Sequence, residues 1–298
     1  MQIRTRESII EILCPAKLNL YLEVKGKRSD GYHEIESVMQ TVSIYDRLLI
    51  EPADSGTQLS CSDPGIPSGD TNTVCRAVKE MRRATGINAG VKIHLEKRVP
   101  AGAGLAGGSS DAAGTIAGLN ALWRTGLSEA RQAQIGAAVG SDVPFFFSAG
   151  GALCRGRGEK VTPLPVIEPI HFVVVWPGFE ISTREIYRRL DILGLTNCGE
   201  NDKIGKFKQQ ITRRGSANSA AIAENFFNRL EQPALGLHGE LKKIKQSMAG
   251  EGLLGVTMTG SGSAFYGLCE RKEAARQKKH KLAALGIGIV FACESTQG

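Results

Sequence analysis

The sequence predicts an α+β protein of two domains, and three observations support this fold class. The chain has 298 residues, which is enough for two domains of ordinary size. Hydrophobic residues make up 42% of it and charged residues 22%, so it can bury a sizeable core. Segments that alternate like strands are interspersed with segments of helical spacing. Because Pro163, Pro165 and Pro169 crowd one stretch, we expect a boundary there. The expected domains cover residues 1–166 and 167–298.

The first third of the chain predicts mainly β-strands, because apolar and polar residues alternate there. The turn-forming residues 27–31 separate two of the strands. Residues 72–83 have a helical composition that ends near Gly86. The predicted strands cover residues 9–13, 18–24, 38–44, 48–51 and 91–96.

A helix is expected after residue 108, because Ile116, Leu119 and Trp123 recur with helical spacing. Ser109 or Ser110 is the expected N-cap residue of this helix. The remaining predictions are helices at 128–139, 183–190, about 219–230, 239–249 and from Lys272, strands at 171–176, on both sides of 260–263 and at 287–293, and no element at 194–218.

The balance of charge favours an anionic partner. Lys and Arg number 37 against 30 Asp and Glu, which gives a net charge of +7 at pH 7. This surplus does not distinguish nucleic acid from a small phosphorylated substrate. No apolar stretch reaches the ~18 residues of a membrane helix, and residues 1–10 lack the apolar core of a secretory signal. We therefore expect a cytoplasmic protein without a membrane partner.

The seven cysteines are expected to be reduced, buried thiols. Their number is odd and no two stand at a Cys-x-x-Cys spacing, which disfavours a disulfide framework. The five histidines lie apart from them in sequence, which disfavours a structural zinc site as well.

Residues 100–111 form a glycine-rich loop, PAGAGLAGGSSD, that admits three interpretations. Gly102, Gly104 and Gly107 satisfy the dinucleotide pattern G-x-G-x-x-G, but a second helix follows where that fold needs a parallel strand. The loop also approaches the P-loop pattern, but Gly108 occupies the position of the required lysine. A dinucleotide-binding site is therefore disfavoured, and an ordinary P-loop is excluded.

The third interpretation is a phosphate-binding turn at the start of a helix. Glycine-rich backbone there presents free N–H groups, and the helix dipole favours an anion. Ser109 and Ser110 add hydroxyl groups suited to phosphate oxygens or to Mg²⁺. The alternative is a strand-to-helix turn without a ligand, but such a turn needs fewer glycines. Since Leu105 is the one large side chain of the loop, we favour the phosphate-binding turn.

Three segments, in this order, resemble the GHMP kinase superfamily of small-molecule kinases. They are residues 15–20 (PAKLNL), the glycine-rich loop, and residues 258–264 (MTGSGSA), and they span nearly the whole chain. The resemblance narrows to the branch that acts on a methylerythritol cytidine diphosphate, on the evidence of residues 30–33 (DGYH), 104–113 (GLAGGSSDAA) and 140–145 (GSDVPF).

The resemblance implies transfer of the γ-phosphoryl group of ATP, with Mg²⁺, to the 2-hydroxyl of that small-molecule substrate. It also implies a two-domain GHMP kinase fold, with an N-terminal domain like domain 2 of ribosomal protein S5 and a ferredoxin-like C-terminal domain. Ala106 departs from the glycine of the wider superfamily, although this branch often has alanine there. The residues that match the ATP-binding pattern are Pro100, Gly102, Gly104, Leu105, Gly107, Gly108, Ser109 and Ser110, with Ser109 as a candidate Mg²⁺ ligand.

The resemblance assigns catalytic roles to Asp142 and Lys17. From the residue pattern alone, an Asp in a turn after a helix is an ordinary backbone cap, and a strand Lys can extend to solvent from an edge. Within the family pattern, Lys17 would keep Asp142 ionised and would stabilise the alkoxide as it forms.

Four further residues match the substrate-binding positions of the family. Asn19 lies on the same strand face as Lys17 and is expected to orient the substrate hydroxyl or diphosphate. Tyr32 and Tyr187 are expected to stack on the cytosine ring, and His33 is the candidate that distinguishes cytosine from uracil. Without the resemblance, Tyr32 and His33 would be assigned to the closing of a hairpin turn.

Two alternatives remain at this point. A nucleic-acid-binding protein would explain the net charge and the basic residues of 271–281. However, that run alternates with alanine and leucine as an exposed helix face does, and no aromatic residues are interleaved to stack bases. We therefore expect no nucleic-acid partner. The closer alternative is another GHMP kinase with a different alcohol substrate.

Overall fold

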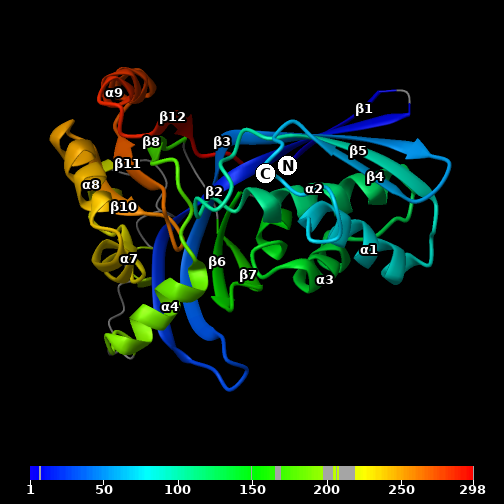
Figure 1. Ribbon diagram of the computed structural model, residues 1–298, viewed down its shortest axis with the longest axis horizontal. Coiled ribbons are helices and arrows are strands. Elements are labelled where there is room, and N and C mark those ends of the chain that lie inside the picture. Colours follow the sequence, from blue (N-terminus) through cyan, green and yellow to red (C-terminus); the bar gives the residue numbers. More distant parts are fainter. Residues whose placement is uncertain are drawn as a thin grey trace.

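Two long antiparallel strands, β2 (Ile9–Lys27) and β3 (His33–Ala53), run through both halves of the molecule (Figure 1). The sequence predicts two shorter strands in place of each, and this prediction is wrong. The pairing shifts register at β-bulges on either side of Lys17, which interrupt the alternation without ending the strands. The expected turn after residue 27 is confirmed as the hairpin that joins them. The computed structural model describes residues 1–6, 8–148, 150–164, 169–196 and 219–297, together with residues 204, 205 and 207.

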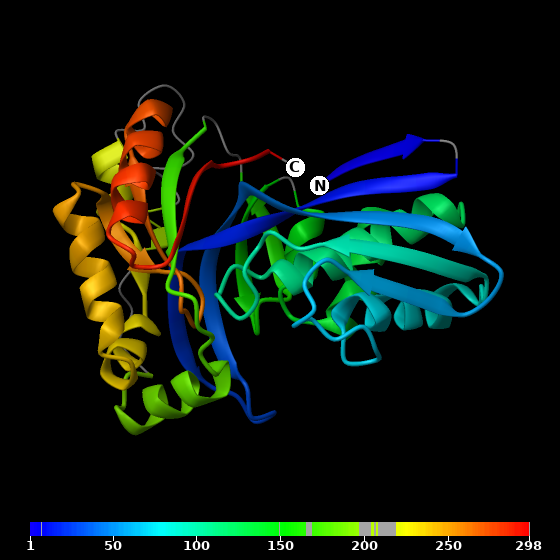
Figure 2. The same ribbon diagram turned by 45° about the horizontal axis from the view of Figure 1, so that its top comes forward.

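A large sheet is built around these two strands, and helices cover one of its faces (Figures 1 and 2). Its further elements are β1 (Gln2–Arg6), β4 (Thr57–Cys61), β5 (Gly90–Glu96), β6 (Gly151–Gly156), β7 (Lys160–Leu164), β9 (Phe227–Asn228), α1 (Thr73–Thr85), α2 (Gly107–Leu122), α3 (Glu129–Val139) and the 3₁₀ helix η1 (Pro144–Phe147). The strand order is β1-β2-β3-β5-β4, with β6 and β7 beside β3 and β9 beside β2. The apolar core lies between this sheet and helices α1, α2 and α3.

A second sheet lies in the other half of the molecule. Its elements are β8 (His171–Trp176), α4 (Thr183–Ile192), α6 (Ser219–Ala223), α7 (Glu231–Leu237), α8 (Glu240–Gly250), β10 (Leu254–Met258), β11 (Phe265–Cys269), α9 (Lys272–Ala284) and β12 (Ile289–Glu294). The strand order is β10-β11-β8-β12, and neighbouring strands are antiparallel. This is the order of a ferredoxin-like βαββαβ unit, so the predicted α+β class is confirmed.

The later half of the chain is hydrogen-bonded into the sheet of the first half. Strand β9 pairs in parallel with β2, and Ser295 forms an isolated bridge with Val42. The amide of Thr296 also donates to the carbonyl of Thr41. The predicted boundary between residues 166 and 167 lies outside the described residues, but these contacts join the two halves elsewhere.

Most of the predicted elements are confirmed, and the errors have local causes. The predicted helix at 219–230 is wrong, because α6 ends at Ala223 and the chain then forms β9. The predicted N-cap of α2 is also wrong, because the helix begins at Gly107 and its N-cap is Ala106, before either serine. The sequence does not predict β1, β4, β6, β7 or α7, which lack the periodicity of the other elements.

Two compositional expectations can be compared with the structure. All six cysteines in the described part of the chain are free thiols, and four of them are buried, which agrees with the expected reduced state. Within the same residues, every helix is too short or too polar to cross a membrane.

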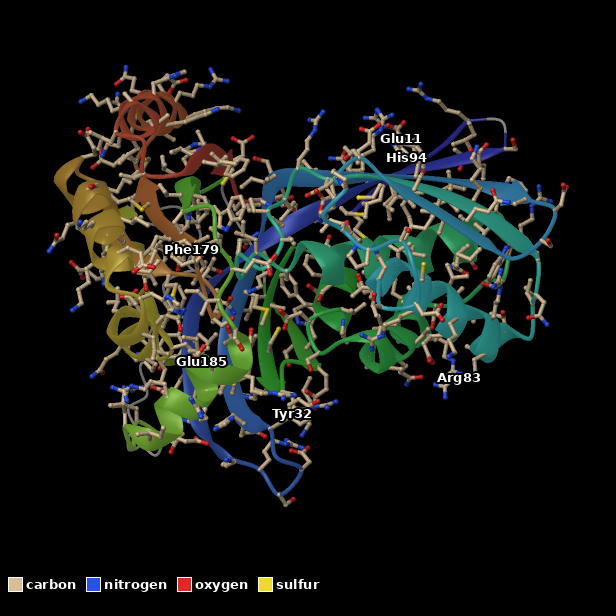
Figure 3. The ribbon with its side chains drawn as sticks, in the orientation of Figure 1. Glu11, Tyr32, Arg83, His94, Phe179 and Glu185 are labelled. Carbon is tan, nitrogen blue, oxygen red and sulfur yellow. The ribbon has the colours of Figure 1, made fainter. Side chains whose placement is uncertain are left out.

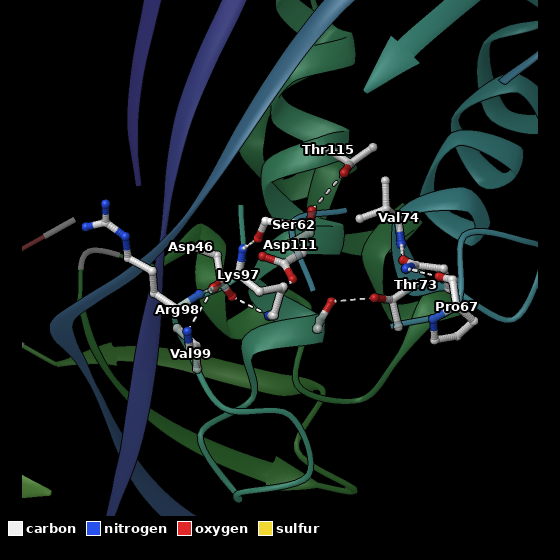
Figure 4. A network of polar contacts seen from close by, with 12 residues as sticks. Asp46, Ser62, Pro67, Thr73, Val74, Lys97, Arg98, Val99, Asp111 and Thr115 are labelled. Atoms are coloured by element: carbon white, nitrogen blue, oxygen red, sulfur yellow. Dashed lines mark hydrogen bonds and ion pairs between the residues drawn. The ribbon is translucent and has the colours of Figure 1, made fainter. Parts of the chain in front are cut away.

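A buried charge cluster fixes the segment that leads into the glycine-rich loop (Figure 4). Lys97 Nζ lies 2.5 Å from Asp46 Oδ2 and 3.0 Å from Asp111 Oδ2. The other oxygen of Asp46 accepts from the amides of Arg98 and Val99, at 2.6 and 2.9 Å. The cluster thereby ties strand β3 and helix α2 to the chain that enters the loop. Burial raises the pKa of Asp111 to about 8, although Lys97 opposes this shift.

Helix α2 packs against the sheet through glycines, which generates the first prediction. A Cβ atom on Gly118 would lie 2.5 Å from Ile12 Cδ1 and 2.6 Å from Ile50 Cδ1. We expect Gly118→Val to lower the free energy of unfolding by about 1–3 kcal/mol through overpacking, as measured by urea denaturation. Gly236→Val is the matched control, because nothing lies within 4 Å of its Cβ position, and it should be neutral or slightly stabilising. Equal losses in both variants would contradict this account of the packing.

The second prediction concerns the pH dependence of stability. Because burial raises the pKa of Asp111 to about 8 in the folded protein, the folded state binds a proton that the unfolded state releases above about pH 4. This contribution to stability is complete below pH 4 and is lost as the pH rises towards 8. Asp111→Asn keeps an oxygen for Lys97 and removes the titration. The free energy of unfolding of Asp111→Asn, minus that of the wild type, should therefore rise steadily between pH 6 and pH 8. If the free energy of unfolding changes with pH in the same way in both proteins, the raised pKa of Asp111 is refuted.

Candidate active site

A cavity of about 1040 Å³ lies between the β2–β3 hairpin, the glycine-rich loop and helix α4. Its wall is formed by segments from both halves of the chain. The structure brings to this wall the following residues that the sequence singles out: Lys17, Asn19, Tyr32, His33, Pro100, Gly102, Gly104, Gly107, Gly108, Ser109, Asp142 and Tyr187.

Leu105 and Ser110 are buried and are not among the residues that line the cavity, and their expected part in ATP binding stays a prediction. The Leu105 side chain is fully buried in the core, and its carbonyl accepts from the amide of Lys17 at 3.0 Å. Ser110 is also fully buried, and its hydroxyl has no hydrogen-bond partner among the described residues. One residue along a helix turns the side chain by about 100°, so Ser109 lines the cavity and Ser110 faces the core.

The backbone of the glycine-rich loop needs glycine for two reasons. Gly102 and Gly104 have φ values of +60° and +78°, in the left-handed region. A Cβ atom on Gly104 would lie 2.1 Å from the carbonyl oxygen of Thr259, so this contact excludes any side chain. Ala106 is itself left-handed, with φ of 56°, and helix α2 begins at the next residue without a side-chain cap. The start of α2 therefore presents its N-terminus at the cavity wall.

Lys17 is the central cation of the site. Its side chain is buried, and Nζ donates to Asn19 Oδ1 at 2.5 Å and to the carbonyl of Gly104 at 2.8 Å. Burial lowers the pKa of this ammonium group, and the charge of Asp142 opposes the shift. Two of its three N–H groups are therefore used within the protein, which leaves one for the cavity.

Asn19 holds Lys17 through contacts with both halves of the chain. Its Nδ2 donates to Ser37 Oγ at 2.9 Å, and its Oδ1 also accepts from Thr259 Oγ1 at 3.2 Å. The Tyr266 hydroxyl donates to the Asn19 carbonyl at 2.8 Å. Since Oδ1 is shared between Lys17 and Thr259, the structure gives Asn19 a positioning role that the sequence did not reveal.

Aromatic side chains gather at the hairpin end of the cavity, where the stacking of Tyr32 and Tyr187 on a cytosine ring stays a prediction. His33 and Tyr187 stack on each other, with ring centroids 4.7 Å apart and planes inclined by 28°. Tyr32 is 54% exposed near the end of the hairpin (Figure 3), and the Arg157 guanidinium lies 4.7 Å from its ring centre. Among the described residues, no contact joins the rings of Tyr32 and Tyr187.

Several charged residues of the site carry no local signal in the sequence. His33 Nε2 lies 2.7 Å from Asp191 Oδ1, which the last turn of α4 supplies. Asp191 is four residues after Tyr187 and thus on the same helix face, but the predicted helix stops one residue before it. The cavity is lined by the basic residues Lys17, Lys27, Lys97, Arg157, Arg184 and Arg188 and by the acidic residues Asp30, Asp111, Asp142 and Asp191. The six basic side chains outnumber the four acidic ones, and this balance suits an anionic ligand.

Comparison with known proteins identifies the family. The model of the GHMP kinase N-terminal domain matches residues 72–150, and that of the GHMP kinase C-terminal domain matches residues 208–288. A 4-diphosphocytidyl-2-C-methyl-D-erythritol kinase of Symbiobacterium thermophilum is 41% identical over 93% of this chain and 96% of its own length.

Solved structures show the same relationship. The crystal structure of a 4-(cytidine 5'-diphospho)-2C-methyl-D-erythritol kinase superposes with a TM-score of 0.78 at 36% identity, over 97% of this chain and 100% of the other. A homoserine kinase from Cytophaga hutchinsonii has a TM-score of 0.75 at 17% identity, over 100% of this chain and 97% of the other, so it shares the fold. The chain belongs to the GHMP kinases and, within them, to the family of 4-diphosphocytidyl-2-C-methyl-D-erythritol kinases.

Proposed function

We propose that this protein transfers the γ-phosphoryl group of ATP to the 2-hydroxyl of 4-diphosphocytidyl-2-C-methyl-D-erythritol, a step in the non-mevalonate route to isoprenoid precursors. One observation carries the proposal. A single cavity has the N-terminus of α2 on one side, the aromatic hairpin end on another, and Lys17 and Asp142 in its wall. The names of the relatives support this substrate.

The glycine-rich loop is the proposed ATP site. The N–H groups at the start of α2 and the cationic wall of the cavity would neutralise phosphate charge, which is the main requirement of phosphoryl transfer. Ser109 supplies a hydroxyl to the phosphates. The loop residues in this proposal are Pro100, Gly102, Gly104, Gly107, Gly108 and Ser109, while Leu105 and Ser110 support the loop from the core.

Mg²⁺ is proposed to accompany ATP. Among the described residues, no group of three or more His, Cys, Asp or Glu side chains is placed to hold a metal ion. Ser109 and Asp142 both line the cavity, and this sparse set of oxygen donors fits an ion that binds mainly through substrate phosphates. Bound Mg²⁺ would offset the negative charge of the phosphates.

Asp142 and Lys17 are the proposed catalytic residues. Asp142 would hold the 2-hydroxyl of the substrate and accept its proton as the oxygen attacks the γ-phosphorus. Lys17, fixed by Asn19 and Gly104, would direct its remaining N–H to the developing alkoxide. A cytoplasmic location and the absence of a nucleic-acid partner stay predictions from the sequence.

The substrate proposal is tested by a panel of alcohols. Phosphorylation is followed by mass spectrometry with 4-diphosphocytidyl-2-C-methyl-D-erythritol, methylerythritol phosphate, homoserine and mevalonate as acceptors. We expect phosphorylation of the first compound only, because the other three lack the base that would reach the hairpin end. Preferential phosphorylation of any other acceptor would replace the proposed function with that of a neighbouring GHMP kinase.

The third prediction concerns the catalytic pair. Asp142→Asn and Lys17→Ala should each lower kcat about 100-fold or more, with much smaller changes in either KM, because their interactions form chiefly in the transition state. The double variant should be little worse than the single ones, since the two groups act together. Steady-state kinetics check this, with thermal unfolding as the control for folding. Near-normal kcat in Asp142→Asn would remove it from the mechanism.

The fourth prediction separates the two serines of the loop. Ser109→Ala should raise the KM for ATP about tenfold, because it loses a hydrogen bond to a charged phosphate. Ser110→Ala is the matched control. Its hydroxyl is buried without a described partner, so its loss should leave this KM unchanged and stability unchanged or higher. A larger effect of Ser110→Ala on the KM for ATP would contradict the assignment.

A further inference from the structure

A chain of three polar side chains crosses from the hairpin to helix α4 at the end of the cavity. His33 Nε2 lies 2.7 Å from Asp191 Oδ1, and Lys27 Nζ lies 2.8 Å from Asp191 Oδ2. The His33 side chain is 7% exposed and that of Asp191 27%. Lys27 ends β2 and His33 begins β3, so both strands of the hairpin converge on one carboxylate of the opposite half.

The carboxylate determines which nitrogen of His33 carries the proton. Hydrogen bonds from Lys27 and His33 lower the pKa of Asp191 despite its partial burial, so it is an ionised group that only accepts. When the ring carries a single proton, that proton therefore lies on Nε2, and Nδ1 is an acceptor. None of the described residues is hydrogen-bonded to Nδ1. The ring lines the cavity and is held flat against Tyr187, so Nδ1 is the nitrogen left for a ligand.

We propose that Asp191 is a positioning residue for base selection, which keeps Nδ1 of His33 an acceptor and so makes the site prefer cytosine to uracil. The inference rests on the proposed function. Cytosine offers an amino donor at C4, where uracil offers a carbonyl acceptor. An unprotonated Nδ1 accepts a hydrogen bond from the amino group of cytosine and repels the carbonyl of uracil. Because the wrong base leaves buried polar groups unpaired, the site discriminates strongly between the two bases. Asp191 thus selects the base without touching it.

Lys27 allows this inference to be tested, because it fixes the orientation of an amide placed at position 191. In Asp191→Asn the side chain has one oxygen, which accepts, and one amino group, which donates. The Lys27 ammonium only donates, so the amide oxygen must face Lys27 and the amino group must face His33. Nε2 then becomes the acceptor, and the single ring proton moves to Nδ1. The free nitrogen of the ring changes from acceptor to donor, which matches uracil.

The kinetic experiment compares kcat/KM for the cytidine substrate and its uridine counterpart in four proteins. Asp191→Asn should lower the cytidine-to-uridine ratio about tenfold or more, with the KM for ATP unchanged. Lys27→Met should retain the wild-type preference, because the carboxylate remains. The double variant Lys27→Met/Asp191→Asn should recover part of the ratio, since its amide is free to turn its oxygen to His33. An unchanged ratio in Asp191→Asn would overturn the proposal.

A second readout does not depend on catalysis. The ¹⁵N chemical shifts of the histidine rings distinguish a protonated nitrogen from an unprotonated one, and the His33→Gln variant assigns the signals. At mildly alkaline pH, we expect the proton on Nε2 in the wild type and on Nδ1 in Asp191→Asn. A wild-type proton on Nδ1 would overturn the proposal even in an active enzyme. If neither nucleotide substrate is phosphorylated while the tautomers behave as expected, the proposed function fails and the positioning by Asp191 stands.

Discussion

The structure of the site depends on the hydrogen bonds of one buried ammonium group. Lys17 donates to the side chain of Asn19 and to the carbonyl of Gly104, and Thr259 shares the same oxygen of Asn19. A charge that is removed from water costs several kcal/mol unless it is paired, so these partners are obligatory. The strand, the glycine-rich loop and the later segment that carry the family resemblance therefore meet at one cation. These three hydrogen bonds bring segments that are distant in the sequence together.

The parts of the site that the sequence predicts are those with local causes. A glycine-rich turn before a helix binds anions because of backbone geometry, and this geometry can be inferred from residues 100–109 alone. Lys17 and Asn19 share a strand face because side chains alternate along a strand. The residue pattern alone does not separate Ser109 from Ser110, because the rotation of the helix turns the first to the cavity and the second to the core.

The parts that the sequence does not predict depend on pairs that are remote along the chain. His33 and Asp191 are separated by 158 positions and Lys97 and Asp46 by 51, and no spacing rule connects them. The long strands are missed for a related reason. Their buried bulges around Lys17 interrupt the two-residue period, so a continuous element is divided into two. Tertiary packing, rather than propensity, decides both cases.

The pairing of the first strands with late segments also affects how the protein is made. The amide of Asn19 donates to a hydroxyl that is translated 240 residues later, and Thr41 is bonded to Thr296. At a synthesis rate of about 5–20 residues per second, the early strands wait roughly 10–50 s for these partners. During that time the hairpin exposes an unpaired edge and apolar side chains, which are hazards for a nascent chain. A ribosome-bound fragment that ends soon after the glycine-rich loop lacks helix α4 and Thr259, so only the later part of the chain can complete the cavity.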